Sequence, residues 1–592
     1  MAAALSRDDL SFLLYDWLNV TELTKLTRFE EHSKETFDDA LELSERIATK
    51  RFAPLYKQLD REEPSIADDG TVTLPSGVAV ALREFYQAGL AACRFDESLG
   101  GAQLPNTVTY AAMAWFQASN IAISTYALLS VAAASLLKAH ASTEQIDAYV
   151  RPLLTGQYFG TMCLSEPGAG SSLADLSTKA VPCSDGTYRI TGTKTWISGG
   201  DHELADNIVH LVLARTPGAP AGVKGISLFI VPKVLPSGQR NDVALVGLNH
   251  KMGYRGTTNA VLSFGDGSFT TDLSPGAVGY LVGEQFHGLK YMFDMMNEAR
   301  LGVGMGATAL GYAAYLRTVE YATVRTQGRA LGDRDVSSKP VAIIEHPDVR
   351  RMVLAQKSYV EGALALVLYC ANLLDKQTAG SDPGTAHEAT MLLNLLTPVA
   401  KSWPSQWCLE ANSLAIQVHG GYGYTREYDV EQQYRDNRLN SIHEGTNGIQ
   451  ALDLLGRKIL MDGGVALNLL DREINSTITH ALITGGVAAD HAAELDFAWG
   501  RLREVTAAIT DPEGVLCALA NATPYMHAFG HIVLAWIWLE QQLAATGTSK
   551  LHRGKHAAAG YFFRVELPKV QALLDLVERG DRTVLDTPPD VF

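Results

Sequence analysis

A block of short β-rich runs, set between long helical stretches, is the feature that most constrains the fold. Between about residues 156 and 285 lie YRITGTKTWIS, NIVHLVLART, GISLFIVPKV and NAVLSFGD, separated by Gly, Pro, Asn and Asp turns. Such runs at near-regular spacing predict a small sheet or barrel. On both sides, apolar residues recur at three- and four-residue steps, which predicts helices. We therefore expect an α+β fold with a β domain inserted between helical domains.

The order of these textures predicts four domains. They are an N-terminal helical domain (1–155), a middle β-barrel-like domain (156–285), a helical bundle (286–460) and an additional C-terminal helical domain (461–592). The length agrees, because 592 residues at roughly 100–200 residues per domain make three or four domains. Fold order alone does not define a function.

Composition argues against several function classes. The chain has 49 Lys and Arg against 65 Asp and Glu, a net charge of −16, which disfavours general binding to nucleic acid or anionic membranes. The cysteines form no CxxC pair, which is typical of reduced thiols in a cytosolic protein. The chain begins without a secretory signal pattern, and no stretch reaches the roughly 18 uninterrupted apolar residues of a membrane span. We expect a cytoplasmic protein without stable membrane insertion.

A short polar hinge, IHEGTNGIQ at residues 442–450, carries a single acid, Glu444. The segments before and after it have helical spacing, so the hinge needs glycine but does not need glutamate. In one interpretation, Glu444 is an acid at a helix terminus, stabilised by the positive end of the following helix. In the other, it is a functional carboxylate.

Two motifs near the β region have the chemistry of a cofactor site. The small residues of LSEPGAGSS, Gly168 to Ser172, offer backbone N–H groups and hydroxyls to a phosphate or a flavin edge, or form an ordinary turn. In GTKTWISGG, Trp196 is flanked by Thr195 and Ser198. A tryptophan there either stacks on a ring or belongs to the core.

Two further motifs lie in the helical bundle. VRTQGR places Arg325 and Gln327 at a helix end, and QVHGGYGY places Gln417 beside Gly420 and Gly421. Paired glycines let the backbone approach a pyrophosphate, and arginine binds one bidentately. We interpret His419, between them, as structural rather than catalytic.

The order of the motifs is more specific than any one of them. LSEPGAGS, GTKTWISGG, KMGYRGT, QVHGGYGYTRE, YRDNR and IHEGTNGIQ together resemble the acyl-CoA dehydrogenase family of flavoproteins, over about residues 80 to 460. The length, with FLLYDWL, MMNEARLGVG and GIQALDLLGRK, is similar to a long bacterial branch. That branch includes fatty acyl-CoA and 3-methylmercaptopropionyl-CoA dehydrogenases and carries an extra C-terminal helical domain.

The resemblance implies an enzyme that oxidises an acyl-CoA thioester to the trans-2-enoyl-CoA, with the hydride passing from Cβ to flavin N5. Glu444 would remove the α-proton, for which a pKa near neutrality suits a general base. The backbone N–H of Glu444 would polarise the thioester carbonyl. Some members carry the base immediately before the arginine of the long helix, but that position here is Ala299.

The resemblance also implies the remaining site residues, without a metal. The FAD contacts would be Ser165, Gly170, Ser171, Trp196, Ser198, Arg325, Gln327, Gln417, Gly420, Gly421 and Thr446, with Gln417, Gly420 and Gly421 coming from a neighbouring subunit. The substrate contacts would be Asn297, Arg300, His443 and Gly445. Three positions depart from the family pattern: Ser172, Gly328 and His443. His443 would either tune the base or line the pocket.

Partners follow from the same resemblance. Electrons would pass to electron-transfer flavoprotein in fatty-acid β-oxidation, and an FAD site shared across a subunit interface implies a homo-oligomer, at least a dimer. The acyl group stays open among a short or medium fatty acyl chain, a thioether-containing group such as 3-methylmercaptopropionyl, and an aryl-propionyl group.

Three alternatives remain. An acyl-CoA oxidase would pass the electrons to oxygen. A DNA-associated flavoprotein of the same fold would use the basic patch of Lys550, Arg553, Lys555, Arg564 and Lys569, against which the net negative charge stands; a solvated helix face or a protein-binding surface explains the patch more simply. The apolar stretch 531–545 would rest on a membrane or, as we expect, pack in a core.

Overall fold

A computed structural model describes residues 4–592 except 271–274, 336, 380–381 and 510–514, and leaves the side chains of 294–296 undescribed. The chain forms two compact units. One consists of Met1–Phe37, Pro105–Ala114 and Val303–Phe592, and is helical; the other consists of Asp38–Leu104 and Trp115–Gly302, and contains the strands.

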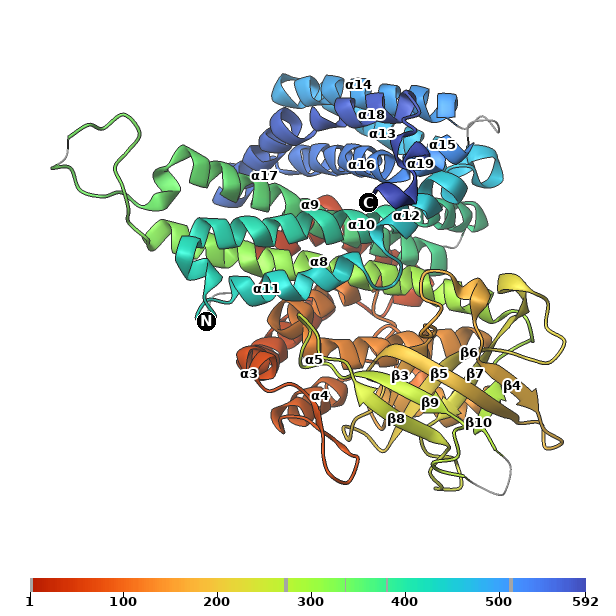
Figure 1. The fold of residues 1–592 in the computed structure, drawn as a ribbon. Coiled ribbons are helices and arrows are strands. Elements are labelled where there is room, and N and C mark those ends of the chain that lie inside the picture. Colours follow the sequence, from red (N-terminus) through yellow and green to blue (C-terminus); the bar gives the residue numbers. More distant parts are fainter. Residues whose placement is uncertain (1–3, 271–274, 336, 380–381, 510–514) are drawn as a thin grey trace. The chain divides into compact units, whose positions relative to one another are not determined.

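The strands of the second unit form a barrel-like sheet (Figure 1). They are β3 (Tyr158–Cys163), β4 (Lys179–Pro182), β5 (Tyr188–Ser198), β6 (Asn207–Arg215), β7 (Ile226–Pro232), β8 (Val243–Leu248), β9 (Asn259–Phe264) and β10 (Ala277–Leu281), besides the separate pair β1 (Ser65–Ile66) and β2 (Val72–Thr73). Strand β10 pairs with both β7 and β5, which closes a ring through β4 and β6. Strands β9 and β8 continue from β5, and β3 lies parallel to β6. The expected middle β domain is confirmed.

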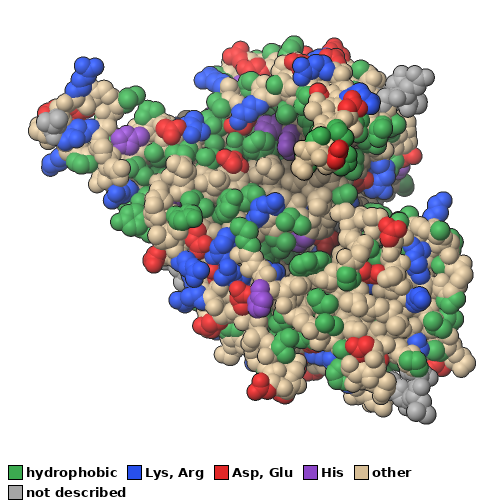
Figure 2. Space-filling view, viewed as in Figure 1, with side chains coloured by type: hydrophobic (Ala, Val, Ile, Leu, Met, Phe, Trp, Pro, Cys, Tyr) green, Lys and Arg blue, Asp and Glu red, His purple; other side chains and the backbone are tan. Residues whose placement is uncertain are grey.

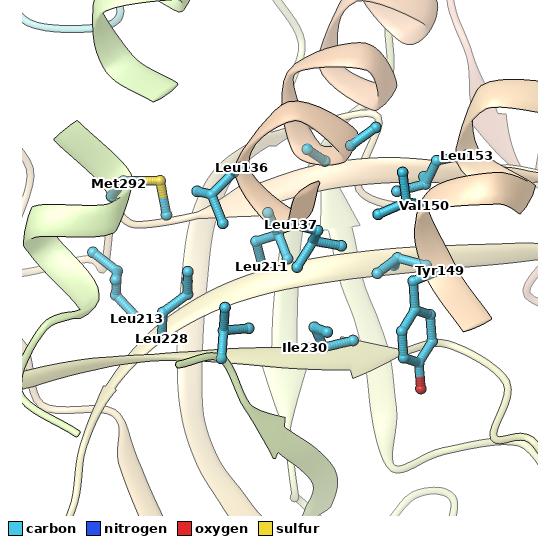
Figure 3. Close-up of a cluster of buried hydrophobic side chains, with 14 of the residues drawn as sticks. Leu136, Leu137, Tyr149, Val150, Leu153, Leu211, Leu213, Leu228, Ile230 and Met292 are labelled. Atoms are coloured by element: carbon cyan, nitrogen blue, oxygen red, sulfur yellow. The ribbon is translucent and has the colours of Figure 1, made fainter. Parts of the chain in front are cut away.

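Strands β6 and β7 are buried along almost their whole length and are mostly apolar, because both of their faces are covered. Successive side chains of a strand point to opposite faces. Leu211 and Leu213 therefore join one buried cluster, with Leu137 and Met292 from helices (Figure 3), whereas Val212 joins the cluster on the other face. A strand buried on both faces loses the alternation of polar and apolar residues.

Helix α5 (Asn106–His140) is kinked at Asn120, whose backbone is not helical. The Asn120 side chain accepts a hydrogen bond from the N–H of Ile123 at 3.2 Å, so it caps the second half of the helix. By length and composition α5 qualifies as a membrane span, but 67% of its most apolar window is buried within the protein. The core helix of a globular protein meets the same criteria.

The helices that lie wholly within the strand-bearing unit are short, and two helices besides α5 are divided between the two units. They are α3 (Tyr56–Arg61), α4 (Gly77–Gln87), α6 (Thr143–Gln145) and α7 (Arg151–Thr155), with α2 (Lys34–Ile47) and α8 (Gly288–Val324) shared.

The first unit consists of helices. They are α9 (Pro347–Ala379) and α10 (Pro383–His419), followed by α11 (Val430–Asn437), α12 (Asn447–Asp453), α13 (Val465–Thr484), α14 (Gly486–Ile509), α15 (Val515–Ala520), α16 (Ala522–Ala544), α17 (Lys550–Tyr561), α18 (Lys569–Glu578) and α19 (Thr583–Asp586), with α1 (Arg7–Ser11) at the start. Helices α9 and α10 run side by side, and the loop between α8 and α9 extends outward at the left of Figure 1. Gly304 lets α8 approach α10, because a Cβ there would lie 2.0 Å from the carbonyl oxygen of Ala400.

The apolar C-terminal stretch is a core element. Helix α16 packs against α13, α14 and α18, and its side chains from Phe529 to Leu539 are buried. The expectation of core packing is therefore confirmed.

One residue of the basic patch expected from the sequence, Lys555, is not on the surface, so the prediction is wrong for that residue. Lys555 is fully buried, where it pairs with Asp9 and lies 3.0 Å from Glu361. Lys569 lies 2.6 Å from Glu566. On the face that Figure 2 views, acidic and basic side chains are interspersed. A helix has two faces, so a run of basic residues in the sequence does not make one continuous surface.

Candidate active site

The Glu444 loop connects α11, through a turn at Arg438–Ser441, to α12. Glu444 has φ +53°, a left-handed conformation that only glycine adopts without strain. The cap of α12 is Thr446, whose Oγ1 accepts a hydrogen bond from the N–H of Ile449 at 3.3 Å. Thr446 therefore caps the N-terminus of α12, and Glu444 is not needed as a capping residue. A strained non-glycine residue held by its surroundings is typical of functional sites.

A buried amide holds the loop from its C-terminal side. The Nε2 of Gln450 donates to the carbonyl oxygen of Glu444 at 3.1 Å and to that of Gly445 at 3.3 Å. Gly445 has φ +87°, and a Cβ there would lie 2.6 Å from the same Nε2. Glycine at 445 is thus required by its backbone conformation and by the closeness of Gln450.

A chain of buried asparagines holds the loop from its N-terminal side. Asn440 Nδ2 donates to Asn437 Oδ1 at 2.9 Å, and Asn437 Nδ2 donates to Asn412 Oδ1 at 2.6 Å. Asn412 Nδ2 ends the chain on the carbonyl of Leu310 in α8 at 3.1 Å. The Oδ1 of Asn440 lies 3.0 Å from His443 Nε2, next to Glu444 in the chain.

The asparagine chain fixes the protonation of His443. Because Asn440 uses its Nδ2 as a donor to Asn437, its Oδ1 is an acceptor, so His443 Nε2 carries a proton. Burial, with a smaller contribution from the charge of Lys401, lowers the pKa of His443 to about 3. His443 is therefore a neutral imidazole at neutral pH. This favours a role in lining and orienting the loop over that of a charged partner of the base.

In the strand-bearing unit, a buried carboxylate organises the LSEPGAGS loop. Glu166 accepts hydrogen bonds from the backbone and hydroxyl groups of Ser177 and Thr178 and lies 3.0 Å from Lys194 Nζ. Burial raises the pKa of Glu166, but Lys194 and these hydrogen bonds outweigh it and lower the pKa to about 2. The carbonyl oxygen of Ser165 accepts the N–H of Thr195 at 3.0 Å. The two cofactor motifs are thus tied together.

Trp196 lies on the surface and not in the core, so the core interpretation is wrong. It is 64% exposed, has φ +63° and falls at an irregularity in the register between β5 and β9. Bulges of this kind re-aim side chains and are frequent beside active sites. Ser198, two residues on, accepts a hydrogen bond from Asn259 Nδ2 at 3.3 Å.

The glycines of the neighbouring loop are open. Gly170 and Ser171 are exposed, and a Cβ on Gly170 would meet no described atom within 4 Å. Ser172, where the family pattern has an acid, donates to Asp175 at 3.3 Å. The loop thus leaves its backbone accessible.

The helical unit brings the arginine motif to the glycine motif. The Arg325 guanidinium lies 6.0 Å from the ring centre of Tyr422 and donates to Gln327 Oε1 at 3.0 Å. Gln417, Gly420 and Gly421 are exposed. These polar groups form one accessible surface with an exposed aromatic ring.

His419 is structural, as expected. Its Nδ1 lies 2.7 Å from the carbonyl oxygen of Ala415, and its ring stacks on Tyr321 with centroids 4.3 Å apart. Burial lowers the pKa of His419.

Helix α8 carries the expected substrate contacts Asn297 and Arg300, and between them Glu298, which forms an ion pair. Arg300 is buried and Asn297 half-buried. Glu298 lies 2.6 Å from Arg94, which also donates to Ser135. The ion pair engages the only acid adjacent to Ala299, so this helix offers no alternative base among 297–300.

Sequence reasoning missed the groups that support the site. Gln450, Asn437, Glu166 and Lys194 each lie inside a motif that was recognised, whereas Asn412 and Asn440 lie outside those motifs, and none of the six was singled out. Polar residues inside apolar helical or strand patterns are a usable signal, because buried polar groups need partners.

Comparison with known proteins agrees with this geometry. Family models match in order: "Acyl-CoA dehydrogenase, middle domain" at residues 161–266, "Acyl-CoA dehydrogenase, C-terminal domain" at 287–460, and "Acetyl-CoA dehydrogenase C-terminal like" at 470–588. Together they cover more than half of the chain.

Full-length relatives extend the match. The chain is 36% identical over 574 residues to 3-methylmercaptopropionyl-CoA dehydrogenase of Ruegeria pomeroyi, covering 94% of this chain and 95% of the relative. It is 31% identical to the broad-specificity linear acyl-CoA dehydrogenase FadE5 of Mycobacterium tuberculosis, covering 99% and 98%. An acyl-CoA dehydrogenase from Bacillus anthracis, solved with FAD, has a TM-score of 0.74 at 19% identity, covering 98% of this chain and 93% of that one. The chain belongs to the acyl-CoA dehydrogenase family, and it is an oxidoreductase with FAD as its cofactor.

The residues present suit that cofactor. An exposed tryptophan beside a serine hydroxyl offers a stacking surface and a polar edge to a flavin, and the exposed guanidinium of Arg325 offers the charge that a pyrophosphate needs. Ser198 and Arg325 are each held within their own unit by a hydrogen bond that does not involve a ligand, with Asn259 and Gln327 respectively.

Proposed function

We propose that the enzyme removes two hydrogens from an acyl-CoA thioester to give the trans-2-enoyl-CoA, with Glu444 as the base. The observation that carries the proposal is the Glu444 loop. Its one acid has a left-handed backbone, a separate residue caps the helix, and buried amides hold the chain on both sides.

In this mechanism the carboxylate of Glu444 takes the proton from Cα of the thioester. The backbone N–H of Glu444 polarises the thioester carbonyl, and this stabilises the enolate-like charge that develops as the proton leaves. FAD supplies the acceptor for the hydride from Cβ. The neutral His443 adds no positive charge beside the carboxylate, so the proton acceptor stays a strong enough base.

We assign FAD binding to Ser165, Gly170, Ser171, Trp196, Ser198, Arg325, Gln327, Gln417, Gly420, Gly421 and Thr446. Substrate binding goes to Asn297, Arg300, His443 and Gly445. Thr446 would serve twice, because its hydroxyl oxygen already caps α12. Exposure of Trp196, Arg325, Gln417 and Gly420 supports the FAD assignment.

The substrate we propose is a fatty acyl-CoA or a 3-methylmercaptopropionyl-like thioester. The Ruegeria relative supports the second and the Mycobacterium relative supports the first. If the substrate is a fatty acyl-CoA, a role in fatty-acid β-oxidation follows. An oxidase that uses oxygen is the alternative within the same chemistry.

The partners are proposed on the family resemblance. Electron-transfer flavoprotein is the expected acceptor. A homodimer is supported by the exposed apolar residues Leu331, Tyr422 and Tyr424, of which Tyr422 lies beside the Arg325 guanidinium. Cytoplasmic localisation stays a prediction. DNA binding is disfavoured by the net charge of −16 and by the burial of Lys555.

An anaerobic titration tests the proposal. The FAD-loaded protein is mixed with propionyl-, butyryl-, octanoyl-, palmitoyl-, 3-methylmercaptopropionyl- and phenylpropionyl-CoA, and loss of the flavin's visible absorbance is followed. We expect at least one thioester to bleach the flavin and the fastest one to identify the acyl class. If no thioester bleaches a fully loaded protein, the proposed reaction is wrong. The rate at which oxygen reoxidises the reduced flavin is then compared with the rate for electron-transfer flavoprotein. A faster reaction with oxygen indicates an oxidase, and a faster reaction with electron-transfer flavoprotein indicates a dehydrogenase.

A further inference from the structure

We infer that Gln450 is a positioning residue for the reaction, because its buried amide fixes the two peptide units that follow the base. The inference rests on the proposed role of Glu444. Gln450 lies in the first turns of α12, six residues after Glu444, and it is fully buried.

One Nε2 group bridges two successive carbonyls. It donates to Glu444 at 3.1 Å and to Gly445 at 3.3 Å, so it draws both peptide oxygens toward the same point. Successive peptide oxygens converge in this way only when the backbone turns sharply between them. Here the turn consists of two left-handed residues, with φ +53° at Glu444 and +87° at Gly445. The amide is therefore the partner that stabilises the strained conformation of the base.

The cost of this amide argues for a role beyond packing. The Oε1 of Gln450 is buried and has no hydrogen-bond partner among the described residues. A buried polar atom without a partner costs about 1–3 kcal/mol. Methionine would fill a similar volume without that cost. What glutamine offers instead is a donor to the two carbonyls, and those carbonyls belong to the base and the residue after it.

Holding the loop affects the proton transfer more than substrate binding. The Glu444 carboxylate must lie within reach of the α-proton, and its N–H must face the thioester carbonyl. Without the Nε2 donor, the two peptide units can relax toward conformations with negative φ at Glu444. The carboxylate then leaves its productive position, although CoA contacts elsewhere remain.

The test compares Gln450→Met with Gln356→Met. Gln356 is a matched control, because it is also fully buried. Its Nε2 donates to one carbonyl, that of Met352 in its own helix α9, at 3.2 Å, and its Oε1 has no partner in the part of the chain that the structure describes. Both variants, the wild type and Glu444→Gln are loaded with FAD. Flavin reduction by the wild type's fastest thioester from the panel is then measured over a range of concentrations.

For Gln450→Met we expect the reduction rate at saturating thioester to fall by about 100-fold, the loss expected when a reacting group is displaced by about 1 Å. The FAD content and the melting temperature should stay close to wild type, and the thioester concentration at half-saturation should change much less than the rate. Gln356→Met should keep the wild-type rate.

Two results would overturn the inference. One is an unchanged saturating rate in Gln450→Met. The other is a loss of rate that reflects general destabilisation. Such a loss would be in proportion to the FAD content, or would be equally large in Gln356→Met. Glu444→Gln separates the two levels of the argument. If it still reduces the flavin rapidly, the base assignment itself is wrong, whatever Gln450 does.

Discussion

At the scale of single residues, the glycines around Glu444 differ sharply in what they tolerate. Gly445 has φ +87°, and a Cβ there would lie only 2.6 Å from Gln450. A Cβ on Gly448 would have Thr446 Oγ1, at 3.9 Å, as its nearest atom among the described residues. Gly448 lies inside α12. Two neighbouring glycines of one motif therefore serve the active-site loop and the helix, respectively.

Gly445→Ala should nearly abolish flavin reduction by acyl-CoA. A left-handed alanine costs roughly 1–2 kcal/mol, and its methyl group displaces the Gln450 amide. We expect a reduction rate lowered by about 100-fold. Gly448→Ala, which gains roughly 1 kcal/mol of helix propensity, should keep the rate and raise the melting temperature. Equal rates for the two variants would mean that the loop geometry is not needed for catalysis.

Sequence alone could predict the residues that we propose to face the ligands, but not the residues that hold them in place. Glu444 and Trp196 were recognisable because motifs keep such chemistry at fixed positions. Gln450 was not, because a glutamine in a helical pattern is usually a surface residue. Its burial and its contact with two carbonyls depend on the left-handed turn, which no local pattern encodes.

At the scale of elements, the β domain positions its loops through one buried ion pair. Glu166 comes from the loop after β3 and Lys194 from the middle of β5, and both are almost fully buried. Short β-rich runs were sufficient to predict the sheet. They were insufficient to predict the ion pair between Glu166 of LSEP and Lys194 of GTKTW, because this ion pair depends on the tertiary closure of the barrel.

Lys194→Met should destabilise the strand-bearing unit and weaken FAD binding. Removing one partner of a buried ion pair costs about 3–5 kcal/mol. Without the lysine, Glu166 keeps its hydrogen bonds to Ser177 and Thr178 but loses its counter-charge. Chemical unfolding and FAD titration measure both effects. The exposed Lys179→Met serves as the control, and a Lys194 variant that matches it in both measurements would contradict this account.

At the scale of the whole molecule, the helical unit is closed by a buried charge cluster. Lys555 of the C-terminal extension pairs with Asp9 near the N-terminus and with Glu361 of α9, and Tyr312 donates to Asp9 at 2.8 Å. Burial raises the pKa of Asp9, whereas Glu361, although buried, has its pKa lowered by Lys357 and Lys555. The extension therefore completes the core of the unit.

Lys555→Met should lower the free energy of unfolding by about 3–5 kcal/mol, because it leaves buried carboxylates without their counter-charge. Lys550→Met, at an exposed position five residues earlier, should change it by less than about 0.5 kcal/mol. Urea unfolding of the FAD-loaded proteins gives both values. Similar losses for the two variants would show that the cluster does not stabilise the unit.

Acid should weaken the strand-bearing unit before its carboxylates titrate. Burial, with smaller contributions from neighbouring cations, lowers the pKa of His202 and of His210 to about 3. An unfolded histidine titrates near about 6.5, so between these values the unfolded state binds protons that the native state does not. The free energy of unfolding should then fall by about 1.4 kcal/mol per histidine for each pH unit below about 6.5.

Melting temperatures from about pH 8 down to about pH 5 check this expectation. His210→Gln should reduce the slope below about pH 6.5, and the exposed His250→Gln should leave it unchanged. A melting temperature that stays flat through this range in the wild type would contradict the account.

The most direct test of the central claim is anaerobic flavin reduction in Glu444→Gln beside the wild type. Glutamine keeps the size and backbone of the loop but cannot accept the α-proton. With the thioester that bleaches the wild type fastest, we predict a reduction rate at least about 1,000-fold lower, with FAD content unchanged. Rapid bleaching by a fully loaded Glu444→Gln would show that another group removes the proton.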